Sequence, residues 1–251
     1  MISRSLTIFE RDVVVFRREL VADLITTLAM PLTFLLVFGW GVGSFIGQIE
    51  GTTYLDFMIP GLISMTAVQS AFDDASWGLW YHRMIQGTIN EYRVNPLTAR
   101  DIIVAKIMSG FFKASFRGVI IGLILAAVAG FRPDPAFALM YVTYLLPGCV
   151  IFSCVGSICG TTIDTPETLG RVQAIVIMPL IFLGGAFFPL STYPASILPW
   201  VRLVPTAAIF DGSRLALLQG ILDPTYLGIL LGVAIVSFFV TVEVFDRRMS
   251  D

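Results

Sequence analysis

The chain has 251 residues, of which 56% are hydrophobic and only 14% are charged. This charged share is well below the roughly 25% of soluble domains. Long apolar runs with their loops use nearly the whole length, so no soluble catalytic domain is left over. The formal net charge of −2 says little, because in a membrane protein the position of each charge matters more than the sum.

Six apolar runs follow one another along the chain, at 24–47, 54–80, 107–131, 136–160, 168–188 and 226–245. A helix needs about 20 residues to cross the hydrocarbon core of a bilayer, and each run has that length or nearly so. The sequence therefore predicts an all-α integral membrane protein with six transmembrane helices in a single domain, 1–251. Spans 1–5 are expected within 24–188 and span 6 at 224–246.

The first 23 residues have the pattern of an amphipathic helix. Arginines recur every seven residues on one face, and apolar residues recur at steps of three and four on another: Ile2, Leu6, Phe9, Val13, Phe16 and Leu20. Such a helix is expected to lie in the cytoplasmic interface with its arginines near anionic headgroups. The alternative is a helix that packs on a partner protein.

Basic residues are distributed unevenly between the two sides of the predicted spans. Eleven fall on one side: Arg4, Arg11, Arg17, Arg18, Arg83, Arg93, Arg100, Lys106, Arg171, Arg247 and Arg248. The other side has Arg132, Arg202 and Arg214. Cytoplasmic loops hold the excess of Lys and Arg, so both termini are predicted to be cytoplasmic.

Four charged residues fall inside spans 2 and 3, namely Asp73, Asp74, Lys113 and Arg117. A charge inside a span costs a few kcal/mol or more unless it is paired or hydrated. Counted along both helices, the four lie at similar depth near the cytoplasmic interface. We expect either an acid–base pair between the spans or four side chains that each extend to the interface. Span 3 exceeds the membrane thickness, so Lys106 is expected to project beyond it.

The polar loop at 81–106 lies between spans 2 and 3. Gly87 is placed to make a turn, and Thr88 with Glu91 has the spacing of a capping box. Asn95 and Pro96 would end the helix that follows. The loop is thus predicted to hold a short cytoplasmic helix at 88–94, and a solvated hairpin is the alternative.

The segment 184–220 combines four prolines with aromatic residues. It is too broken for a spanning helix and too apolar for an ordinary loop. Short helices dipping into the outer leaflet, at 189–222, would fit, because irregular backbone is tolerated at depth when protein covers it. No metal site is predicted: Cys149, Cys154 and Cys159 are expected to be packing residues.

The order of these elements resembles the membrane subunit of ABC-2 type exporters. Six pieces carry the resemblance: FMIPG at 57–61, GTINE at 87–91 leading to NPL at 95–97, GGAFFP at 184–189, LPW at 198–200, LVP at 203–205 and DGSR at 211–214. Together they span essentially the entire chain. The family includes drug, nodulation-factor and polysaccharide exporters of bacteria.

This resemblance implies a homodimer in the bacterial inner membrane, with a separate cytoplasmic ABC ATPase as partner. It assigns docking on that ATPase to a coupling helix formed by Gly87, Thr88, Asn90, Glu91, Asn95 and Pro96. It also implies outer-leaflet helices that include Phe188, Pro189, Pro199, Trp200 and Pro205. The chain lacks the glycine-rich P-loop motif, so ATP and Mg²⁺ would be bound by the partner and no catalytic residue is predicted here.

The expected function is ATP-driven export of an amphipathic substrate, such as a drug, a lipid or a lipid-linked saccharide. No role with nucleic acid is expected. One alternative is a proton-coupled secondary transporter that uses Asp73 and Asp74. Another is an intramembrane serine hydrolase, which needs a positioned base; the sole histidine, His82, is expected at the interface instead.

Overall fold

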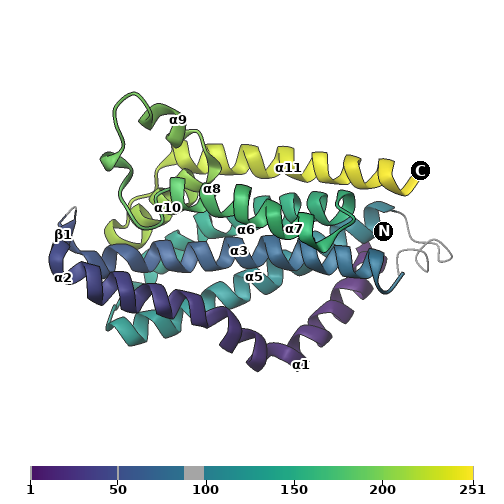
Figure 1. Cartoon of the computed structure of the whole chain (residues 1–251), viewed down its shortest axis with the longest axis horizontal. Coiled ribbons are helices and arrows are strands. Elements are labelled where there is room, and N and C mark those ends of the chain that lie inside the picture. Colours follow the sequence, from purple (N-terminus) through teal and green to yellow (C-terminus); the bar gives the residue numbers. More distant parts are fainter. Residues whose placement is uncertain (1, 50, 88–98, 251) are drawn as a thin grey trace.

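The structure is a computed structural model that describes residues 2–49, 51–87 and 99–250 (Figure 1). Within those residues, six helical stretches are long and apolar enough to cross a membrane: Leu6–Ile46, Tyr54–Met84, Asp101–Ala129, Pro135–Thr162, Pro166–Leu183 and Pro224–Arg248. They correspond one to one to the six predicted runs. The structure is therefore consistent with the all-α membrane protein expected from the sequence.

The predicted interfacial helix and the first span form one continuous helical stretch. Helix α1 (Ile2–Phe34) continues through a π-helical stretch, η1 (Leu35–Val42), into α2 (Gly43–Ile46). Position 23, the predicted boundary, is thus not a helix end. Instead α1 bends sharply near its middle (Figure 1). A short antiparallel pair, β1 (Gln48–Ile49) and β2 (Thr52–Thr53), then turns the chain back.

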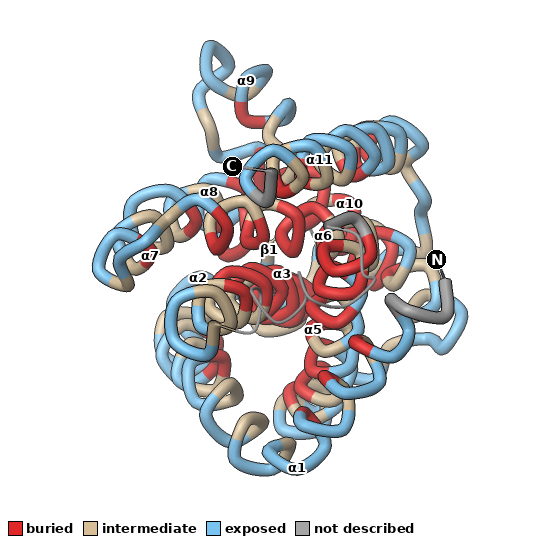
Figure 2. Tube along the Cα trace, turned by 90° about the vertical axis from the view of Figure 1, so that its right-hand side faces the viewer, coloured by how far each residue is buried: buried red, intermediate tan, exposed pale blue. Residues whose placement is uncertain are grey.

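The centre of the molecule is α3 (Tyr54–Met84), which is buried along most of its length (Figure 2). The Thr53 side chain caps its start by accepting a hydrogen bond from the backbone N–H of Asp56 at 3.2 Å. Two long helices pack on α3, namely α5 (Ala99–Ala129) and α6 (Pro135–Thr162). The first half of α1 packs on α5 through edge-to-face ring pairs, Phe9 with Phe112 and Phe16 with Phe116.

Contact between α3 and α6 is close because α6 presents glycines to it. A Cβ atom at Gly156 would lie 2.5 Å from the carbonyl oxygen of Phe72, and one at Gly160 would lie 2.5 Å from that of Ser76. Small residues spaced by four let the backbones of two membrane helices approach. The GxxxG pattern at 156–160 thus fixes the tightest helix pair of the core.

The fifth span is shorter than predicted. It comprises α7 (Pro166–Val172), the π-helical η2 (Gln173–Ile177) and α8 (Met178–Leu183), with Thr165 as the expected N-cap. It ends five residues before 188, because the chain turns at Gly185, where φ is +87°. Such a conformation is readily adopted by glycine and ends a helix.

Short elements link the fifth and sixth spans. They are η3 (Leu190–Thr192), α9 (Leu198–Arg202), α10 (Pro205–Arg214) and the π-helical η4 (Leu215–Gln219), and α11 (Pro224–Ser250) follows. Figure 1 places α10 inside the bundle and α9 at its edge. The start of α1, the ends of α3 and α11 and the start of α7 lie at one end of the molecule, whereas β1 and α2 lie at the other.

Candidate functional site

A cluster of charged side chains joins three helices in the middle of the bundle. Arg117 of α5 is only 6% exposed. Its guanidinium donates two hydrogen bonds to Asp23 of α1, from Nε to Oδ2 and from Nη2 to Oδ1, the latter at 2.8 Å. Its Nη1 donates to Oδ2 of Asp74 on α3. A planar guanidinium suits such paired contacts with carboxylates, so this one side chain ties α1, α3 and α5 together.

The other two members of the predicted charge set behave differently. Oδ1 of Asp73 accepts a hydrogen bond of 2.8 Å from Nε2 of Gln173, which lies on η2 of the fifth span. Lys113 is half-buried and makes no ion pair among the described residues. The structure therefore joins Asp74 with Arg117, adds Asp23 from the first span, and directs Asp73 towards the fifth.

A cavity of about 300 Å³ adjoins this cluster, between α1, α3 and Arg117 of α5. Its lining combines three carboxylates and the Arg117 guanidinium with hydroxyls and with an apolar wall of methionine and proline. The lining residues include Asp23, Thr27, Met30, Pro31, Met65, Gln69, Ser70, Asp73, Asp74 and Arg117. It is thus a polar cavity inside an apolar bundle.

A second, larger cavity of about 790 Å³ lies between the first half of α1, the end of α3 and the start of α5. Asp74 lines both cavities. Lys106, at its wall, is 7% exposed and its Nζ lies 2.7 Å from Oδ2 of Asp12, a contact that was not predicted from the sequence. The reason is that α1 folds back onto α5, and its Asp12 supplies the counter-charge.

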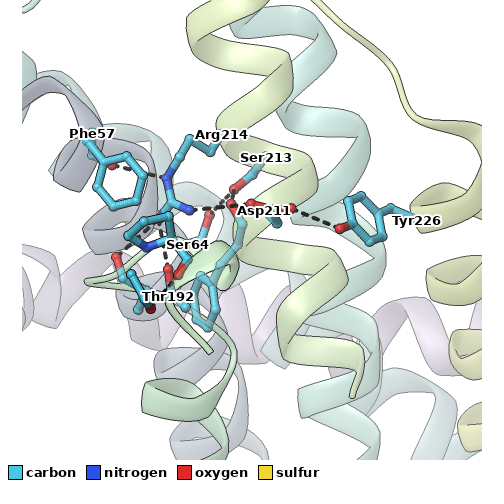
Figure 3. A network of polar contacts seen from close by, with 11 residues as sticks. Phe57, Ser64, Thr192, Asp211, Ser213, Arg214 and Tyr226 are labelled. Carbon is cyan, nitrogen blue, oxygen red and sulfur yellow. Dashed lines mark hydrogen bonds and ion pairs between the residues drawn. The ribbon is translucent and has the colours of Figure 1, made fainter. Parts of the chain in front are cut away.

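A second buried arginine, Arg214 of α10, lies near the opposite end of α3 (Figure 3). It is 3% exposed. Its Nη2 donates to the carbonyl oxygens of Gly185 at 2.8 Å and Ala186 at 3.4 Å, and its Nε donates to that of Phe57 at 3.3 Å. The guanidinium carbon also lies 3.7 Å from the centre of the Phe57 ring, a cation–π geometry.

Neighbouring polar groups complete the Arg214 environment. Asp211, one turn earlier on α10, lies 3.6 Å from Nη1 and accepts a hydrogen bond from the Tyr226 hydroxyl at 2.8 Å. Ser213 and Ser64 are hydrogen-bonded through their hydroxyls at 3.2 Å (Figure 3). Arg214 thereby fastens α10 and the turn after α8 to the start of α3.

The remaining predicted site residues do not gather at either cluster. Pro199 lies at the start of α9 and Pro205 at the start of α10, while Phe188 and Trp200 are exposed. Gly87 has a φ of +62°, which suits the turn expected there. The other members of the predicted coupling helix, Thr88, Asn90, Glu91, Asn95 and Pro96, lie outside the described residues.

Sequence reasoning missed three participants. Asp23 was assigned to the end of an interfacial helix, although it is the only acid between 20 and 49, which is a usable signal. The sequence places Arg214 on the side opposite the termini and in the DGSR piece at 211–214 but does not predict its contact with Asp211, although an acid three residues before an arginine in an apolar segment is a usable signal. Gln173 carries no such signal, because a lone amide in a span has many possible partners.

Comparison with known proteins gives consistent matches along the chain. The sequence profile of the ABC-2 type transporter family matches residues 4–218. Nodulation protein J of Bradyrhizobium diazoefficiens is 27% identical over 244 residues, which cover 96% of this chain and 92% of that protein. Inner membrane transport permease YadH of Escherichia coli is 28% identical over 238 residues, covering 93% and 90%. Nodulation protein J of Rhizobium meliloti is 25% identical, covering 97% and 93%.

Proposed function

Because the chain belongs to the ABC-2 type transporter family, we propose that it is the membrane-spanning permease subunit of an ATP-driven exporter. The observation that carries this proposal is the family match over residues 4–218, which include five of the six candidate spans and α10. A relative named as an inner membrane transport permease covers nearly the same length. The proposed location is accordingly a bacterial inner membrane, with several crossings.

Work is divided between two kinds of subunit in this proposal. This sequence has no P-loop, so a separate cytoplasmic ABC ATPase would bind ATP and Mg²⁺ and hydrolyse the nucleotide. The segment 87–96 would dock on that ATPase. Its position supports the assignment, because it joins the end of α3 to the start of α5, and α5 is a single helix of 31 residues.

Motion at the docking segment would reach the membrane through Arg117. A long helix moves as a rigid body, and Arg117 holds α5 to both α1 and α3 by charge-assisted hydrogen bonds. A shift of α5 driven by the ATPase would therefore also displace the first two spans. In the proposed homodimer, these spans and the fifth would open or close a path between the two copies.

Orientation follows from the distribution of basic residues. Both termini and the docking segment would face the cytoplasm, while α9 and α10 would lie in the outer leaflet. The first half of α1 would lie in the cytoplasmic interface, packed on α5 through Phe9 and Phe16. The cargo would be amphipathic, which suits cavities that combine charged and apolar walls.

Proton-coupled transport is the weaker reading. Asp74, one of its two proposed carriers, is engaged by the Arg117 guanidinium. Proton uptake by Asp74 would have to break this ion pair. Of the two proposed proton carriers, Asp73 would then have to carry the proton without Asp74.

The test is assembly and ATP turnover with the ABC ATPase encoded in the same genome. The tagged full chain is expected to co-purify with it, and ATP hydrolysis by the complex in liposomes should exceed that of the ATPase alone. Thr88→Pro and Glu91→Arg should abolish co-purification or stimulation, while Arg202→Gln, on exposed α9, should retain both. Independence of the two proteins, or normal stimulation in both loop variants, would contradict the proposal.

A further inference from the structure

The cavity beside Arg117 offers more hydrogen-bond acceptors than it has donors to satisfy them. Within the described residues, Oδ2 of Asp73 and Oδ1 of Asp74 accept no hydrogen bond, although the other oxygen of each carboxylate is engaged. Both residues line the same 300 Å³ of space. Unpaired carboxylate oxygens are costly inside an apolar bundle unless a ligand or water reaches them.

The charged residues of the lining indicate that a ligand of this cavity would be a cation. Three carboxylates line the cavity, from Asp23, Asp73 and Asp74, against the one guanidinium of Arg117. Asp23 and Asp74 share that guanidinium, whereas Asp73 has the neutral amide of Gln173 as its described hydrogen-bond partner. Among the described residues, Asp73 is therefore the carboxylate of this lining that makes no ion pair.

A buried hydroxyl gives an independent indication of a ligand. Ser70 lies one turn before Asp73 and Asp74 on α3, is 7% exposed and lines the cavity. Its hydroxyl makes no hydrogen bond among the described residues, whereas nearby Thr66 bonds to the carbonyl of its own helix at 2.7 Å. Because this hydroxyl reaches the surface of the cavity, a group that enters the cavity can hydrogen-bond to Ser70.

Size and wall chemistry decide between a metal ion and an organic cation. No group of three or more His, Cys, Asp or Glu in the described part of the chain is arranged to hold a metal. The cavity is also far larger than a bare ion requires, and Met30, Pro31 and Met65 form an apolar wall. That wall would bury a short alkyl group beside the cationic head.

We propose that this cavity binds an organic cation with a primary ammonium head and a short alkyl chain. The ammonium would donate to Oδ2 of Asp73, Oδ1 of Asp74 and the Ser70 hydroxyl, which match its three N–H donors. Binding itself needs neither ATP nor a partner. That such a cation is the cargo rests on the proposed function, and would narrow the amphipathic cargo to amines.

The test is calorimetric titration of the purified full chain in a neutral detergent with n-butylammonium. Saturable binding is expected. Butyltrimethylammonium, which has the same charge but no N–H donors, should bind about tenfold more weakly, and butyrate should not bind. No saturable binding of n-butylammonium, or equal affinity for the trimethylated probe, would overturn the proposal.

Variants locate the binding. Asp73→Asn should weaken n-butylammonium binding about tenfold or more, and Ser70→Ala roughly threefold to tenfold. The control is Asp56→Asn, the same change at the other end of α3, outside the cavity lining, and it should bind as the unaltered chain does. Elution as a single species verifies folding, and Ser70→Ala serves as the deciding variant if Asp73→Asn misfolds. Unchanged affinity in the folded variants would place the binding elsewhere and overturn the assignment.

A second measurement separates this inference from the proposed function. ATP turnover by the complex with its ATPase is recorded with and without n-butylammonium. If the isolated chain binds n-butylammonium but no ATPase assembles with it, the cation site is retained and the exporter function is rejected. An active exporter complex whose permease binds no amine would retain the exporter and reject the cation site.

Discussion

The two faces of α3 are built on different principles. Towards α6, glycines bring backbone against backbone, with Gly156 and Gly160 set on the carbonyls of Phe72 and Ser76. Towards α1, the same helix presents Asp73 and Asp74 to a cavity. Close packing resists movement because any added atom must displace a neighbour, whereas ion pairs across a cavity can separate and re-form. Helix α3 thus combines a closely packed side, towards α6, with a polar side that faces a cavity.

The largest loss of stability is expected from Arg214→Met, near the start of α3. The change leaves the carbonyls of Phe57 and Gly185 without their donor and Asp211 without its cation. Removing one member of a buried charge pair costs about 3–5 kcal/mol. Thermal unfolding in detergent would measure it, with Arg202→Met on exposed α9 as the matched control. Equal melting temperatures would show that this arginine does not hold α10.

On the cavity side, Arg117→Met should cost about 3 kcal/mol, because it leaves two carboxylates without their cation. Asp74→Asn in the same chain should recover part of that loss. A double-mutant cycle on unfolding free energy is expected to give a coupling of about 1–3 kcal/mol. Strictly additive losses would mean that the pair contributes nothing, and the two faces of α3 would then differ less than the structure implies.

Two glycine-to-alanine substitutions, each adding one methyl group, compare the packed α6 side of α3 with an open position on α3. Gly156→Ala should destabilise by about 1–3 kcal/mol, since its Cβ would meet backbone atoms of α3 that cannot yield without moving the helix. Gly78→Ala adds the same group to α3 itself, where no atom lies within 4 Å, and should be neutral or slightly stabilising. The measurement is again thermal unfolding, and similar shifts for both would remove the distinction.

A small effect on stability, less than about 1 kcal/mol, is expected from Asp73→Asn. The asparagine oxygen can still accept the hydrogen bond from Gln173, and the Arg117 contacts are untouched. Denaturation midpoints of the variant and the unaltered chain would be compared. A loss as large as that of Arg117→Met would show that Asp73 is part of the ion-pair framework rather than a spare acceptor.

The sequence predicts most of this fold because hydrophobic length is a strong local signal. All six spans are where the apolar runs place them, and Thr165 with Pro166 marks the start of α7 as expected. The end of the fifth span is the main error. The apolar run continues through Phe187 and Phe188, but a backbone turn at Gly185 interrupts the helix first, and hydropathy does not detect a turn made of apolar residues.

Side-chain partners were predictable only where few candidates exist. Helical rise places Asp74 and Arg117 at similar depth, and two acids with two bases leave few combinations. Arg117 binding Asp23 could not be foreseen from depth alone, because it depends on the bend in α1 (Figure 1). Likewise Lys106 has its buried partner Asp12 only because the first half of α1 returns along α5.

The π-helical stretches in the first and fifth spans, at 35–42 and 173–177, make these two rods tolerant of changes in length. Each hydrogen bond there encloses one residue more than in an α-helix. Deleting Val37 could convert the stretch locally to α-helix and leave the helical phase on either side almost unaltered. The same deletion in the middle of α3 would turn every later side chain by about 100°, carrying its acids out of the cavity and its small residues off α6. Natural insertions and deletions of one residue should accordingly be accepted in the outer rods and rejected in the central one.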